Sequence, residues 1–144
     1  MSGFGLHAVG EFFDVDLYLS QFSIDYSSIW YRGKNLHTSS GFSKYLGNEF
    51  NLDTDEQETI AIKYIRQNRD ALEAVVKWEN VEAVILGISP EIHISSGVSS
   101  VCLSFSPLLV TVAGEIGLQL AFYVRPSISY DYEYEISAMQ AGWQ

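Results

Sequence analysis

Hydrophobic and polar positions follow different periods along the chain, and the changes of period divide it into elements. Short apolar runs bounded by glycine at about 5–10 and 39–47 predict two strands, and an apolar run over 81–88 predicts a third. The aromatic and aliphatic side chains of 24–31 predict an extended segment that ends in a turn at Gly33. The chain is therefore rich in short strands.

Three further segments alternate apolar and polar residues, which is typical of half-buried strands. They are residues 92–94, residues 100–105 and a final run that starts at Ile128. Pro90 restricts the first of these to an edge or a turn. The final run is aromatic on one side and acidic on the other, so we expect a strand or an extended arm there.

Helical spacing dominates the middle of the chain and predicts a long helix over about 55–78. Thr54 and Gln57 have the spacing of a capping box, and acidic residues fill the first turn, where the helix dipole favours negative charge. Asn68 can interrupt this helix and cap a second piece. A shorter helix is predicted over about 14–22, with Asp14 as its cap.

The most apolar stretch, residues 104–124, permits three interpretations. A membrane span is disfavoured because polar residues, Glu115 among them, interrupt it. One long strand is favoured locally by β-branched valines. Ser106-Pro107 is instead a helix start, and Gly114 and Gly117 are stop signals. We therefore predict a two-turn helix followed by a buried strand.

Together these elements predict an α+β fold. We expect a single domain over residues 1–126, with a mostly antiparallel sheet of about five or six strands packed by one long helix and two short helices. Residues 127–144 form the predicted C-terminal strand or acidic-aromatic arm. The chain has 144 residues, enough to bury a core without disulfides or metals.

The charge balance limits the class of partner that the chain can bind. The chain has 8 basic and 18 acidic residues and a formal net charge of -10. Such a surface repels nucleic acid and anionic lipid, so we expect no nucleic-acid or membrane partner, whereas a basic protein is favoured. The lone Cys102 and the absence of a signal-peptide pattern at the start indicate a reducing, cytoplasmic location.

The sequence contains only weak matches to catalytic or metal-binding motifs. The three histidines and Cys102 lack the spacing of metal ligands. Asp14-Val15-Asp16 has the D-x-D pattern of some metal-dependent transferases, but helix capping explains it better. No serine lies in a G-x-S-x-G motif. We therefore predict a protein that is not an enzyme, with no catalytic residues, metal or cofactor.

Two segments have the composition of a partner-binding surface. The stretch 47–58 contains five acidic residues and no basic one, and the tail 129–135 alternates tyrosine with acids, a composition common at interfaces. Helix capping and a charge-protected edge strand are the alternative explanations. The candidate partner-binding residues are Asp53, Asp55, Glu56, Glu58, Tyr130, Asp131, Tyr132, Glu133, Tyr134 and Glu135.

The order of three segments resembles a bacterial domain-of-unknown-function family, number four-two-seven-nine, whose members are small α+β domains. They are "VGEFFDVDLYLSQFSI", "SSIWYRGK", and "RQNRDALEAVVKWENVEAVILGI" followed by "LSFSPLLVTVAGEIGLQLAFYV". Asp25-Tyr26 replaces the proline that usually precedes the aromatic-basic segment, and the tail from Ser127 extends past the domain. The resemblance implies this fold and no established activity.

The small size, acidity and tyrosine-acid tail favour a stoichiometric protein inhibitor. We expect an immunity protein that neutralises a cognate bacterial toxin, and a basic nuclease would suit the charge. The alternatives are an accessory or scaffold domain that self-associates, for example as a homodimer, or binds another protein, and an undetected small-ligand-binding protein.

Overall fold

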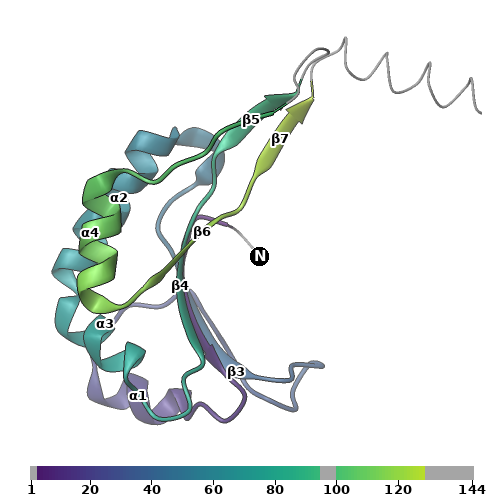
Figure 1. Ribbon diagram of the computed structural model, residues 1–144. Helices are drawn as coiled ribbons and strands as arrows, with labels where there is room; N and C mark the ends of the chain where they lie inside the picture. The colour runs from purple at the N-terminus through teal and green to yellow at the C-terminus, as the bar shows by residue number, and fades with distance from the viewer. Residues whose placement is uncertain (1–2, 95–99, 129–144) are drawn as a thin grey trace, which may run out of the picture.

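The computed structural model describes residues 3–94 and 100–128, which form two layers (Figure 1). Helices cover one face of a five-stranded sheet and leave the other face open. The helices are α1 (Val15–Gln21), α2 (Thr54–Gln67), α3 (Arg69–Val76) and α4 (Pro107–Ile116), with a 3-10 turn at Glu49–Asn51. The sheet contains β1 (Gly5–Gly10), β2 (Ser28–Trp30), β3 (Ser40–Tyr45), β4 (Ala83–Ile88) and β6 (Gln119–Phe122).

The strand order is β2-β3-β1-β4-β6, and every pair is antiparallel except β4 with β6. These two parallel strands are joined by a crossover that contains α4. Both continue beyond the sheet as a second parallel pair, β5 (Glu91–Ile94) with β7 (Arg125–Ile128). The α+β class and the mostly antiparallel sheet predicted from the sequence are confirmed.

The core lies between the helices and the covered face of the sheet. Its residues alternate along the strands, as a half-buried strand requires: Phe4, Leu6 and Ala8 are fully or almost fully buried. Tyr18 from α1 stacks on Phe42 of β3, with ring centroids 5.6 Å apart. The helices contribute further buried side chains, namely Ile65, Leu72, Val75, Leu109 and Val112.

The start signals of the two short helices are confirmed. The Asp14 carboxylate accepts the Leu17 N–H before α1, and the Ser106 hydroxyl accepts the Leu109 N–H before α4. At the end of α4, Gly117 takes a left-handed conformation with φ 93°, which glycine adopts without steric cost. Gly114 was wrongly predicted as a stop signal, because it lies inside α4 and tertiary packing overrides its low helix propensity.

The long helix is confirmed in position, but it is divided and begins differently. Asp53, rather than Thr54, is the N-cap, and its capping-box partner is Glu56. Asn68 separates α2 from α3, and its side-chain amide donates to the Tyr64 carbonyl instead of capping α3.

Two strand predictions differ from the structure. Residues 100–105 form no regular element, because Val101 and Leu103 are exposed and only Phe105 packs inward, stacked on Phe122. β6 is half-buried instead of buried, since it lies at the sheet edge. The tail strand is described only as far as Ile128 in β7, and the rest of that prediction lies outside the described residues. In the described part of the chain, no helix combines the length and apolarity needed to cross a membrane.

Candidate functional site

The acidic segment 47–58, which leads into α2, contains four of the predicted partner-binding residues. The Asp53 carboxylate accepts the Glu56 N–H at 2.8 Å, and the Glu56 carboxylate accepts the Asp53 N–H at 3.4 Å. Both side chains remain exposed, so each carboxylate keeps acceptor capacity toward solvent. Asp55 is also exposed and forms no side-chain hydrogen bond or ion pair with the described residues.

The other two acids of this segment are structural. Glu58 is only 6% exposed, and its carboxylate accepts the Ser106 N–H at 3.1 Å, which joins α2 to the start of α4. The Glu49 carboxylate accepts the N–H groups of Gly3 and Phe4 at 3.0 and 3.1 Å. The structure thus leaves Asp53, Asp55 and Glu56 accessible to a partner, and it buries Glu58.

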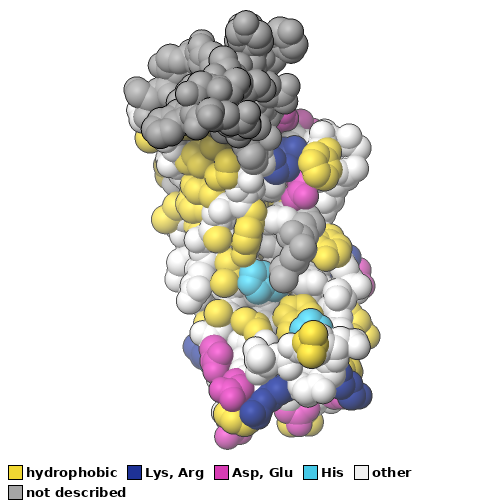
Figure 2. All heavy atoms as spheres, turned by 90° about the vertical axis from the view of Figure 1, so that its right-hand side faces the viewer, with side chains coloured by type: hydrophobic (Ala, Val, Ile, Leu, Met, Phe, Trp, Pro, Cys, Tyr) yellow, Lys and Arg dark blue, Asp and Glu magenta, His cyan; other side chains and the backbone are white. Residues whose placement is uncertain are grey.

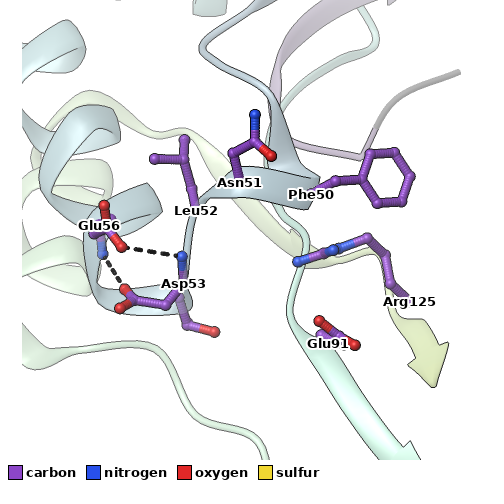
Figure 3. A pocket seen from close by; sticks show the side chains of 8 residues that line it. Phe50, Asn51, Leu52, Asp53, Glu56, Glu91 and Arg125 are labelled. Atoms are coloured by element: carbon purple, nitrogen blue, oxygen red, sulfur yellow. Dashed lines mark hydrogen bonds between the residues drawn. The ribbon is translucent and has the colours of Figure 1, made fainter.

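Asp53 and Glu56 line a surface hollow of about 380 Å³ that we call the α2 hollow (Figure 3). Its remaining walls come from the 3-10 turn and from the β5-β7 ribbon. The full lining is Phe50, Asn51, Leu52, Asp53, Thr54, Glu56, Glu91 and Arg125. Three carboxylates and one guanidinium therefore surround the same space.

An aromatic ring and a fixed cation form one side of the α2 hollow. The Arg125 guanidinium lies 5.2 Å from the centroid of the Phe50 ring, within the range of a cation–π contact. Its Nε and Nη2 both donate to the Ser89 carbonyl at 3.1 Å, so the group is held in place. Phe50 is 74% exposed, so most of its ring is accessible to a partner. Figure 3 shows both side chains at the mouth of the hollow near Glu91.

Three lining residues, Phe50, Glu91 and Arg125, were not predicted from the sequence. Glu91 and Arg125 are register partners in the parallel β5-β7 pair, so they meet only because the chain crosses over through α4. Phe50 stands beside predicted acids, and an aromatic in an acidic, turn-rich segment was the one signal that could have found it. The tail candidates Tyr130, Asp131, Tyr132, Glu133, Tyr134 and Glu135 lie outside the described residues.

The D-x-D segment has local structural roles. Asp14 caps α1, and the Asp16 carboxylate accepts a hydrogen bond from the Tyr31 hydroxyl at 2.7 Å. That bond raises the pKa of Tyr31, because it stabilises the protonated phenol. Within residues 3–94 and 100–128, no group of three His, Cys, Asp or Glu side chains is placed to hold a metal ion.

Comparison with known proteins adds no functional assignment. The chain matches no family model, no curated protein and no solved structure. The resemblance to the domain-of-unknown-function family therefore stays a prediction.

Proposed function

We propose that this chain is a stoichiometric protein inhibitor of the immunity type, which binds a basic protein at the α2 hollow. The observation that carries the proposal is the exposed Phe50 beside three carboxylates, in a chain of net charge -10. A basic, nuclease-type bacterial toxin is the partner that this charge favours, and a cytoplasmic location is part of the same proposal.

The charges of the hollow differ in their effect on a cation. The amino end of α2 carries partial positive charge, which offsets part of the attraction from Asp53 and Glu56. Glu91 belongs to β5, so no helix end offsets its charge. Arg125, which is held by the Ser89 carbonyl and Phe50, contributes one positive charge against the three carboxylates. A partner's lysine or arginine would therefore meet net negative potential beside an apolar ring.

Acidic residues at the rim act mainly on the association rate, and the buried apolar contact acts on the dissociation rate. We expect a partner to cover Phe50, because its exposed ring offers apolar area to bury and aromatic side chains often contribute most of the binding energy at an interface. The free face of the ring also offers a second cation–π contact to an arginine of the partner.

The test compares two variants with equal net charge against the product of the adjacent gene. The hollow variant carries Asp53→Asn, Glu56→Gln and Glu91→Gln, because Asn and Gln preserve the capping box. The control carries Asp70→Asn, Glu79→Gln and Glu82→Gln, three exposed acids outside the hollow lining. We expect the hollow variant to slow association roughly tenfold at low salt and the control to change it much less.

Two outcomes would contradict the proposal. If no complex forms at low salt with a basic product of a neighbouring gene, the inhibitor function is wrong. If both variants slow association equally, overall charge and not the α2 hollow attracts the partner. Phe50→Ala should accelerate dissociation without changing the salt dependence, which separates the apolar contact from the charges.

A further inference from the structure

The open face of the sheet carries a row of hydrogen-bonding side chains that the helices do not cover. The strand register places Ser28, Ser43, His7 and Ile85 side by side on β2, β3, β1 and β4. In Figure 2, which views this side of the molecule, histidine and hydrophobic side chains occupy the middle, and charged side chains lie toward the ends. The middle of this face thus combines hydrophobic side chains with histidine and serine, and it carries no Asp, Glu, Lys or Arg among the residues that line its hollow.

A hollow of about 470 Å³ lies along this row, and we call it the sheet hollow. Its lining comes from β1, β2, β3 and the loop between β2 and β3. The residues are His7, Val9, Ser28, Ile29, Trp30, His37, Ser39, Ser43 and Tyr45. Its volume falls in the range of small-molecule sites, and none of its lining residues belongs to the α2 hollow.

Ser43 supplies the sheet hollow with a hydroxyl that a polar group can bind. This residue is only 3% exposed, and its hydroxyl forms no hydrogen bond with any described residue. The hydroxyl lines the hollow, so a group that enters there can form a hydrogen bond with it in place of water. The imidazole of His7 and the hydroxyl of Ser28 also have no hydrogen-bond partner among the described residues, and both face the same space.

The lining favours an uncharged ligand over a charged one. None of the nine residues is Asp, Glu, Lys or Arg. Burial lowers the pKa of His7, because desolvation disfavours the imidazolium form, so this ring is neutral near neutral pH. A phosphate, carboxylate or amine would lose its water here without gaining an opposite charge.

The ends of the sheet hollow are aromatic. The Trp30 indole lies against Gly41, where a Cβ atom would come within 2.7 Å of the ring, so glycine makes room for it. Tyr45 stands four residues further along β3, about 13 Å away at the rise of a strand. Ser43 and His7 lie between these positions. His37 lies beside the Trp30 ring, with ring centroids 6.2 Å apart. A flat ring entering the hollow would therefore meet the aromatic rings of Trp30 and His37 and the hydrogen-bonding groups of Ser43 and His7.

We propose that the sheet hollow binds a small, uncharged, planar heterocycle of the nucleobase type, which stacks on Trp30 and hydrogen-bonds Ser43 and His7 along its edge. Hydroxyl and neutral imidazole groups both donate and accept, which matches the mixed donors and acceptors of such a ring. Base–aromatic stacking tolerates different bases, so the site selects ring chemistry more than one base. This binding does not depend on the proposed inhibitor function, because it uses a separate surface.

The experiment is a titration of the full chain, followed by amide chemical shifts, with three probes. Adenosine supplies the neutral planar ring, AMP adds a phosphate to the same ring, and methyl glucoside is neutral but not planar. We expect adenosine to shift the amides of β1, β2 and β3 around His7 and Ser43, AMP to bind more weakly, and methyl glucoside to cause no shift there.

Variants then test the residues. Ser43→Ala removes a hydroxyl that no described residue uses, so the fold should persist, and the affinity for adenosine should fall roughly three- to tenfold, as for one lost hydrogen bond. Trp30→Leu should weaken binding further, and Ser104→Ala, an exposed serine elsewhere, should change nothing. Shifts absent with adenosine, AMP binding as tightly as adenosine, preferential binding of methyl glucoside, or equal affinities for Ser43→Ala and the native chain would each overturn the proposal.

Discussion

Gln57 shows how one side chain can replace part of a strand. It is fully buried, its Nε2 donates to the Ser89 carbonyl at 2.9 Å, and the Ser89 N–H donates to its Oε1 at 2.7 Å. A second bond from Nε2 reaches the Leu52 carbonyl at 3.2 Å. The side-chain amide thereby pairs with the end of β4 as a neighbouring backbone would. From the sequence, Gln57 was predicted to form a capping box with Thr54. The observed box, Asp53 with Glu56, has the same spacing of three residues, so spacing alone does not distinguish the two pairs.

The substitution Gln57→Leu should destabilise the protein. Leucine keeps the packing volume but leaves the buried Ser89 N–H without its acceptor, so the free energy of unfolding should fall by about 1–3 kcal/mol. Gln67→Leu, on the exposed side of α2, is the matched control and should stay within about 0.5 kcal/mol of the native value. Urea denaturation measures both variants, and equal values would show that the Gln57 bonds add nothing to stability.

The lowered pKa of His7 predicts a weak dependence of stability on pH. Burial lowers its pKa below the ordinary value of 6.5, so below that pH the unfolded chain binds this proton more readily than the folded one. The free energy of unfolding should therefore fall between pH 6.5 and the lower native pKa, by about 1.4 kcal/mol per unit of pKa difference.

The measurement is urea denaturation between pH 7.5 and about 5.5, where ordinary carboxylates stay ionised. His7→Gln should flatten the curve, and His37→Gln, at an exposed position, should leave the slope contributed by His7 intact. A native slope that His7→Gln does not change would assign the pH dependence to other groups.

At the scale of elements, local signals located the helices better than the strands. A helix N-cap can be predicted from one or two residues, so Asp14 and Ser106 were enough to locate the starts of α1 and α4. Alternation over 100–105 predicted a strand that does not exist, because a strand also needs a partner to satisfy its backbone groups. No described strand pairs with this segment.

Two substitutions of Asp53 can separate the contribution of its hydrogen bond to helix stability from that of its charge. Asp53→Ala removes the acceptor for the Glu56 N–H and should lower the free energy of unfolding by about 1 kcal/mol. Asp53→Asn keeps an acceptor at the same position and should change it by only a few tenths of a kcal/mol. Thermal and urea unfolding measure both, and similar losses for the two variants would mean that the charge, not the cap, stabilises the helix start.

At the scale of the whole molecule, the sequence predicted the class of fold but not its hollows. The α2 hollow combines the predicted Asp53 and Glu56 with Glu91 and Arg125, which lie 34 positions apart and meet through a parallel pairing that no local pattern encodes. The sheet hollow depends on the register of three strands, and a register shift of one residue would turn Ser43 and His7 toward the core.

The central position of β1 has a consequence for synthesis. Its residues 5–10 leave the ribosome well before β4, one of its two neighbours, which begins only at residue 83. Translation at about 5–20 residues per second leaves this apolar strand with an unpaired edge for several seconds. During that interval β1 can pair with β3 on one side only, so the nascent chain is most prone to aggregation before β4 emerges. Chaperone demand should therefore peak between the synthesis of β1 and that of β4.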